Sequence, residues 1–184
     1  MRRAPNKKLP PLELLNSLLK VDHDSPSGLR WRKPQARCLK PGMVAGSQTA
    51  TGYWRVSITV CGVNKKYFAH RIIYYMQTGE DPVDYQIDHV NDQKDNLNVR
   101  KATPLQNKGN TRKMPDCETY QSSSRYKGVT RRKVQGGVKW EASLMHNHRY
   151  IYIGRFNTEE DAATAYNNAA AKLWGEFARL NEIE

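Results

Sequence analysis

The stretch IDHVNDQKDN, residues 87–96, gathers acids and amides around a single histidine in a chain that is basic overall. Asp88 and His89 are adjacent, so in a strand their side chains point to opposite faces. Phosphodiester hydrolysis needs a divalent cation on hard oxygen ligands and a base of near-neutral pKa. An aspartate beside a histidine can supply one of each. Such a pair suits a metal-assisted nuclease centre, but taken alone it favours a solvated acidic turn, so the decision depends on the elements around it.

The charge balance points to a polyanionic partner. The 184 residues include 30 Lys and Arg against 18 Asp and Glu, for a net charge of +12. The positive charge concentrates in residues 1–40 and 121–156, whereas 41–120 are nearly neutral and 157–184 are acidic. No apolar run approaches the 18 or so residues of a membrane helix, and the N-terminus lacks the apolar core of a secretory signal. We therefore expect no membrane partner and a cytoplasmic location.

The three cysteines, Cys38, Cys61 and Cys117, are far apart and odd in number. They form no CxxC pair, so neither a disulfide framework nor a cysteine-based zinc site is predicted.

Several elements must position the acidic run. Leucines at 12, 15 and 19 predict a short amphipathic helix, and residues 53–60 and 66–69 predict a hairpin across Cys61–Asn64. HRIIYYMQTG predicts a helix closed by Gly79. IDHVN then predicts a strand, followed by a turn, a short second strand and a helix that begins near Pro104.

This order of elements resembles a nuclease family. From Tyr67 to Asn110, AHRIIYYMQTGE, IDHVN, DN, NVRKAT and QNKGN are similar to the successive motifs of HNH endonucleases, which have a ββα-metal fold. The resemblance implies that His89 is the general base and that Asp88 and Asn107 bind one divalent cation. An amide ligand suits Mg²⁺ or Mn²⁺ better than Zn²⁺. The implied product carries a 5′-phosphate.

Three further residues have roles implied by the same resemblance. Asn98, in the N-V-R frame, orients the His89 ring, with Asn96 as the alternative. For His70 and Arg71, packing at the helix start and a phosphate contact are equal alternatives, and Arg71 is included among the predicted nucleic-acid contacts.

The second half predicts three strands and a covering helix. YKGVTRR, VKWEASLM and RYIYIGRF alternate apolar and polar residues, with Val138, Trp140, Ala142 and Leu144 on one face, joined by Ile151 and Ile153. The following helix presents a stripe of Ala162, Ala165, Tyr166, Ala169, Ala170 and Leu173 to that face. Asn157 or Thr158 caps its start.

These 60 residues resemble an AP2 domain through Y-x-G-V, W-x-A-x-L, I-G-x-F, E-E-D-A-A-x-A-Y-N and A-x-L-N. In that family the open face of the sheet lies in the DNA major groove. The resemblance implies DNA contacts from Thr130, Arg132, Lys139, Glu141, Ser143, Met145, Tyr150 and Tyr152, and we add Arg131 and Lys133. Plant-type AP2 domains carry arginines where this chain has Thr130, Met145 and Tyr150. Arginine is the side chain best suited to reading guanine.

Together these features predict an α+β protein: a small ββα-metal module with an N-terminal hairpin region, then a three-stranded antiparallel sheet on one helix. The predicted boundaries are a basic N-terminal segment at 1–50, a nuclease module at 51–113, a linker at 114–124 and the DNA-binding domain at 125–184. In the N-terminal segment and just beyond it, Trp31, Arg32, Lys33 and Trp54 are expected to add backbone contacts.

The sequence thus predicts a monomeric, metal-dependent homing endonuclease that acts on double-stranded DNA and needs no small-molecule cofactor. Its resemblance to phage homing enzymes suggests a phage source. The alternatives are a DNA-binding regulator that does not cleave and an RNA-binding protein whose Tyr150 and Tyr152 stack on unpaired bases.

Overall fold

The computed structural model describes residues 7–90, 96–117 and 121–183, in two compact units, Met1–Ala102 and Thr103–Glu184. Within the described residues the fold is α+β, with small antiparallel sheets and few helices, as predicted. The start of the basic arm, residues 91–95 after His89 and residues 118–120 of the linker lie outside the described residues. None of the helices described is long and apolar enough to cross a membrane.

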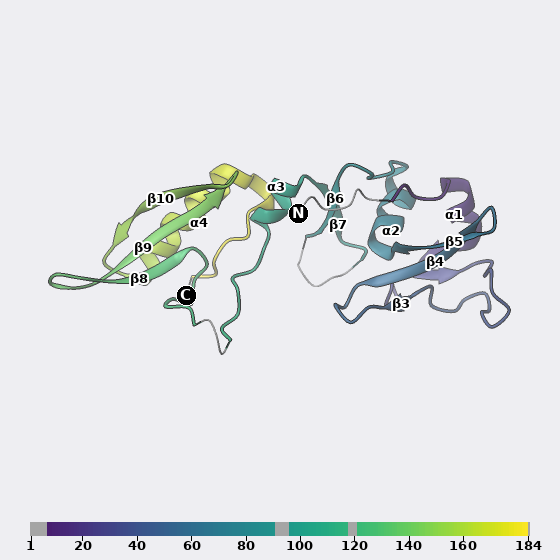
Figure 1. The fold of residues 1–184 in the computed structure, drawn as a ribbon, viewed down its shortest axis with the longest axis horizontal. Coiled ribbons are helices and arrows are strands. Elements are labelled where there is room, and N and C mark those ends of the chain that lie inside the picture. The colour runs from purple at the N-terminus through teal and green to yellow at the C-terminus, as the bar shows by residue number, and fades with distance from the viewer. Residues whose placement is uncertain (1–6, 91–95, 118–120, 184) are drawn as a thin grey trace. The chain divides into compact units, whose positions relative to one another are not determined.

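The first unit begins with a helix and two small sheets. Helix α1 (Leu12–Leu18) leads into β1 (Leu19–Val21), which pairs with β2 (Leu29–Trp31). A three-stranded sheet follows, in the order β3 (Ser47–Gln48), β4 (Trp54–Val60) and β5 (Val63–Phe68). Helix α2 (Ala69–Thr78) contacts β4 and β5 (Figure 1). The core between them contains Leu15, Leu19, Leu29, Val56, Ile58, Ile72 and Ile73, all fully buried.

The β4–β5 hairpin is tighter than predicted. Val60 pairs with Val63, so the turn is only Cys61-Gly62, and both residues have positive φ, 49° and 77°. Left-handed conformations at both central positions are those of a two-residue type I′ turn, whose twist matches that of the strands. Cys61 is an unusual residue for this position, which is why composition alone favoured a longer loop. Helix α2 ends as predicted, with Gly79 in the left-handed conformation.

A second hairpin carries the acidic motif. Strand β6 (Gln86–His89) pairs with β7 (Val99–Ala102), and both contact α2. Helix α3 (Pro104–Gly109) begins at Pro104, close to the predicted start of the helix. The second unit begins one residue earlier, at Thr103. Thr103 and Gln106 form a reciprocal capping box at its N-terminus.

The three predicted C-terminal strands are present as β8 (Val129–Val134), β9 (Gly137–His146) and β10 (Arg149–Phe156), in the order β10-β9-β8. Helix α4 (Glu159–Trp174) covers one face (Figure 1), and the Thr158 side chain caps it. A short 3-10 helix, η1 (Gly175–Phe177), follows. The helix is rotated from its predicted stripe: Leu173 is exposed, whereas Ala163 and Trp174 are buried.

Trp174 and Asn181 connect the C-terminal part of the second unit to earlier segments of the same unit. Gly109 of α3 lies against Trp174 so closely that a Cβ there would be 2.6 Å from the ring. The Asn181 side chain accepts from the Lys127 backbone N–H at 2.7 Å and donates to the Lys127 carbonyl at 3.1 Å. These two bonds give the terminal asparagine of the A-x-L-N motif a structural role.

Candidate functional site

Asp88 and His89 both lie in the interior of the first unit, at the end of β6. Asp88 is 4% exposed, and the β6–β7 register places Arg100 directly opposite it. The Arg100 Nε donates to the Asp88 Oδ2 at 3.0 Å. A charge-assisted bond at this depth fixes the position of the carboxylate. A buried, oriented carboxylate is unlike a solvated turn.

Aromatic rings surround His89. Its ring centroid is 5.1 Å from that of His70, edge to face, and 6.1 Å from that of Tyr53. Phe68 in turn stacks on His70, with ring centroids 5.3 Å apart. His89 is 9% exposed, so its position is set by packing rather than by solvent. Tyr53 immediately precedes β4, Phe68 ends β5 and His70 lies in α2, which explains why the motif needs the upstream hairpin and helix.

His70 is held in its neutral form. It is 7% exposed, and its Nδ1 is buried with no hydrogen-bond partner in the described part of the chain. Burial, followed by the nearby His89 and Arg71, lowers the pKa of His70 to about 3. This environment favours the packing role that the sequence left open for His70.

We expect the first unit to lose stability on acidification because of His70. Below pH 6.5 the unfolded chain binds a proton that the folded protein cannot accept until about pH 3, so stability falls as pH falls across that window. Between pH 6.5 and 5 the loss is about 2 kcal/mol. His70→Phe should remove most of this dependence in urea titrations of the full chain, whereas His23→Phe, at an exposed position, should retain it. Equal acid sensitivity in both variants would contradict the assignment.

The Arg71 side chain makes its hydrogen bonds within the fold. It is 6% exposed, its Nη1 donates to the Tyr85 carbonyl at 2.9 Å, and its Nη2 donates to the Pro82 carbonyl. Burial lowers the pKa of Arg71, and Asp81 opposes that shift. These contacts tie α2 to the segment before β6 and favour packing over the predicted nucleic-acid contact.

The predicted asparagines lie in different settings. Asn98 is exposed, whereas Asn96 is buried and its amide donates to the Ser27 carbonyl at 3.0 Å. Asn107 is half-buried on α3, in the second unit. Among the described residues no three His, Cys, Asp or Glu side chains converge to hold a metal ion. The predicted donor set of one carboxylate and one amide fits Mg²⁺ or Mn²⁺, which retain water and accept substrate phosphate oxygens.

The second unit presents one open sheet face. Cross-strand pairs place the predicted contacts together on it: Thr130 is opposite Glu141, Arg132 opposite Lys139, Met145 opposite Tyr150 and Ser143 opposite Tyr152. Tyr150 and Tyr152 are 58% and 53% exposed. Arg131 and Lys133 are also exposed, but they pair with Trp140 and Val138, whose side of the sheet faces α4. Strand alternation therefore separates these two from the other predicted contacts.

The sequence missed Arg155. Strict alternation places it with Ile151 and Ile153 on the helix side, but the register shifts between Tyr152 and Gly154, so that Arg155 pairs with Glu141. The shift is a β-bulge, which turns the following residue to the other face. A glycine inside a strand, here Gly154, was the available signal.

Glu141 organises this face. Glu141 lies on the open side of the sheet, yet it is only 9% exposed. Its carboxylate accepts a hydrogen bond from the Tyr150 hydroxyl at 3.2 Å. Arg132 and Arg155 lie 3.6 and 3.5 Å from its two carboxylate oxygens. A single carboxylate thus fixes two arginines and a tyrosine in place, leaving cations at one end of the face and the exposed Met145, Tyr150 and Tyr152 at the other.

The predicted backbone contacts near the N-terminus are partly wrong. Trp31 is 4% exposed and belongs to the hydrophobic core, against which Trp54 also packs. The Arg32 Nε donates to the Leu19 carbonyl at 3.0 Å. Alternation of charge and aromatics here reflects strands with one buried face rather than a nucleic-acid surface.

The buried Asp-His pair on a two-stranded hairpin can be compared with known proteins. Residues 67–100 match the HNH endonuclease family. The matched segment runs from the end of β5 through α2 and β6 to Arg100, and so includes His70, Asp88 and His89.

Two kinds of relative are found. An uncharacterized HNH endonuclease of Acanthamoeba polyphaga mimivirus is 38% identical over 62% of this chain and 57% of its own length. Two Arabidopsis thaliana proteins, an AP2-like ethylene-responsive transcription factor and an ethylene-responsive transcription factor, are 36% and 40% identical over 38% and 32% of this chain. The chain spans 18% and 14% of their lengths, respectively. No solved structure matches.

Proposed function

We propose that this protein is a metal-dependent DNA endonuclease of the homing type, with an HNH centre built on Asp88 and His89 and a DNA-binding AP2 sheet in its second unit. The observation that carries the proposal is the buried Asp88–His89 pair, which ends β6 inside the segment that matches the HNH endonucleases. The two kinds of relative favour the same pairing of nuclease and DNA-binding parts.

In this proposal His89 takes the proton from the attacking water. The flanking rings of His70 and Tyr53 restrict the His89 ring, and neutral His70 adds no charge beside it. Asn98 is assigned to orient the ring by a hydrogen bond. A base held in one orientation needs little reorganisation when the proton moves.

Asp88 and Asn107 are assigned as the ligands of one Mg²⁺ or Mn²⁺. When bound, the cation stabilises charge on the phosphodiester and on the leaving 3′ oxygen, so the product carries a 5′-phosphate. Arg100 orients the Asp88 carboxylate through its 3.0 Å bond, as groups behind metal ligands commonly do.

A nicking assay tests the proposal. Purified protein is incubated with supercoiled plasmid and Mg²⁺ or Mn²⁺, and EDTA is added to a parallel reaction. We expect relaxed or linear plasmid only with the cation, and end-labelling should detect 5′-phosphates. Intact plasmid across a range of protein and cation concentrations, together with tight binding to the same DNA, would instead support a regulator that does not cleave.

We expect Arg155 to contribute to DNA affinity, because the bulge places it beside Arg132 on the open face. Arg155→Ala should weaken binding by about 1–3 kcal/mol if it contacts a base, or reduce the salt slope by about 1 if it contacts a phosphate. Arg149→Ala is the matched control, since Arg149 is exposed on the same strand but pairs with His146 on the helix side. Binding is measured on duplexes that the unaltered protein selects from a random library. Equal losses in both variants would contradict the role of the bulge.

A further inference from the structure

A long part of the first unit carries cations and no carboxylate. Residues 25–79 contain nine Lys and Arg and not one Asp or Glu. Three of the nine have contacts within the fold: Arg30 pairs with Asp22, Arg32 bonds the Leu19 carbonyl, and Arg71 is buried. The other six are exposed, without a carboxylate partner in the described part of the chain: Lys33, Arg37, Lys40, Arg55, Lys65 and Lys66.

The β4–β5 hairpin has a polar outer face. Val56 and Ile58 are fully buried on the side that faces α2. On the other side the register pairs Arg55 with Phe68, Ser57 with Lys66 and Thr59 with Asn64. Apart from the Phe68 ring, the side chains on this outer face are therefore cations, hydroxyls and an amide, all of which can donate to phosphate oxygens.

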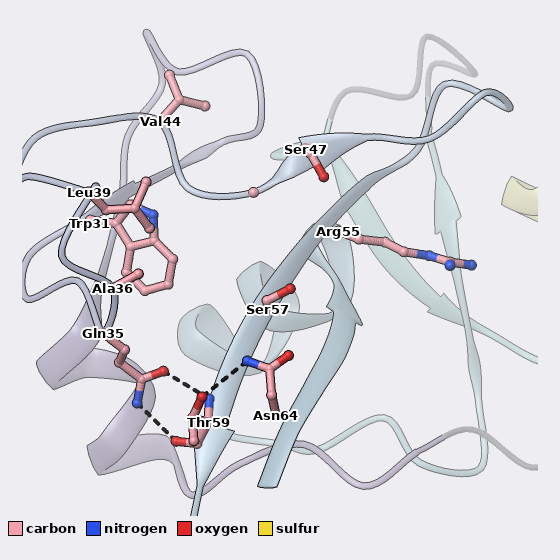
Figure 2. Close-up of a pocket in the computed structure, with 11 residues that line it drawn as sticks. Trp31, Gln35, Ala36, Leu39, Val44, Ser47, Arg55, Ser57, Thr59 and Asn64 are labelled. Carbon is pink, nitrogen blue, oxygen red and sulfur yellow. Dashed lines mark hydrogen bonds between the residues drawn. The ribbon is translucent and has the colours of Figure 1, made fainter. Parts of the chain in front are cut away.

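Two hollows border the outer face and share Arg55 and Asn64. One, of about 430 Å³, is lined by residues from both sides of β5, and its cations are Lys7, Arg55, Lys65, Lys66 and the buried Arg71. The other, of about 290 Å³, is lined by Ser47, Ser57 and Thr59 and, from another segment, by Trp31 (Figure 2). Gln35 also lines it and makes two hydrogen bonds to the Thr59 backbone, 2.8 and 2.9 Å long. No carboxylate lines either hollow in the described residues.

A stack of side chains joins this face to the candidate catalytic residue. The Arg55 guanidinium lies 4.5 Å from the centroid of the Phe68 ring. Phe68 stacks on His70, which in turn contacts His89 edge to face. Both hollows border Arg55. A DNA strand bound along the face is therefore linked to His89 through three successive contacts: Arg55 with Phe68, Phe68 with His70, and His70 with His89.

We propose that the outer face of the β4–β5 hairpin, with Arg55 and Lys66 at its centre, is a second DNA-binding surface that holds the duplex backbone beside His89. The inference rests on the proposed action on DNA and assigns a surface separate from the sheet of the second unit. A phosphate backbone fits because the face offers cations and neutral donors without opposing charge. The other sheet then supplies sequence preference, and this face supplies placement of the scissile strand.

The test measures binding of the full chain to a selected duplex without divalent cations, so that its result does not depend on cleavage. Arg55→Gln/Lys66→Gln is compared with the unaltered protein across a salt series. Lys20→Gln/Lys172→Gln makes the same change in net charge at exposed positions that line neither hollow. We expect the slope of log affinity against log salt to fall by about 2 in the first variant, one per phosphate contact, and to stay nearly constant in the control. With Arg55→Gln/Lys66→Gln, protection of the duplex from hydroxyl radicals should disappear over one short segment of DNA and persist over the rest of the bound site.

Equal slopes in the two variants, with the same protected segments, would overturn the proposal. Thermal melting checks that both remain folded, as expected for exposed side chains. Preference for single-stranded RNA over duplex DNA, with the slope difference retained, would overturn the assignment to DNA. Absence of cleavage with the slope difference intact would count against the proposed nuclease and leave this surface supported.

Discussion

His89→Ala is expected to lower the rate of plasmid cleavage by about 10²–10⁴-fold, the usual contribution of a general base. DNA affinity should change by less than about twofold, because the proposed role of His89 is proton transfer and only 9% of the residue is exposed for contact with the DNA backbone. The measurement is single-turnover cleavage with Mg²⁺, alongside binding of the same duplex without the cation. His23→Ala, at an exposed position, is the control and should cleave like the unaltered protein.

Loss of the ring also leaves a gap beside His70 and Tyr53, so His89→Asn is needed as a second variant that retains more of the volume. If both variants lose cleavage while melting and binding stay near those of the unaltered protein, the chemical role is supported. Cleavage that survives in either variant at the normal rate would contradict it. Parallel loss of binding, melting temperature and cleavage in both would assign His89 to packing.

Local patterns account for much of what the sequence predicted. The Gly79 helix end, the Thr158 cap and the three C-terminal strands depend on residues close together in the chain, and the structure confirms each. One difference between prediction and structure is also local. Cys61-Gly62 forms a two-residue turn, which the sequence did not predict because cysteine is uncommon at such a position. Helix α4 buries Trp174 in place of Leu173, and Trp174 packs against Gly109, which lies 65 positions earlier and is invisible to a local pattern.

Parts of the site could not be read from local patterns. The bond between Arg100 and Asp88 depends on the β6–β7 register. The sequence between the two strands did not indicate which residues of β6 and β7 pair. Arg155 depends on a bulge, and a shift of one residue moves a side chain to the opposite face. Trp31 was assigned to DNA because charge and aromatics alternate, although the same pattern arises where one face of a strand enters a core.

Gly128→Ala is expected to destabilise the second unit by about 3 kcal/mol or more, a large share of the stability of a small domain. Gly128 has a φ of +76°, and a Cβ there would lie 2.1 Å from the Tyr166 ring and 2.7 Å from the Ser143 carbonyl oxygen. Tyr166 is 2% exposed, so its ring has nowhere to move. Because Ser143 belongs to the open face of the sheet, duplex affinity should fall together with the melting temperature.

Gly136→Ala separates the two causes of this effect. Gly136 has a φ of +91°, but nothing lies within 4 Å of its Cβ position, so alanine there adds backbone strain alone, about 1 kcal/mol. Urea titration of the two full-length variants should therefore differ by about 2 kcal/mol or more, which is the contribution of the collision with Tyr166. Equal destabilisation would mean that the glycine of the Y-x-G-V motif serves only its backbone conformation. The larger loss at Gly128 would tie this motif to the seating of α4 against β8 and β9, and so to the shape of the face proposed to bind DNA.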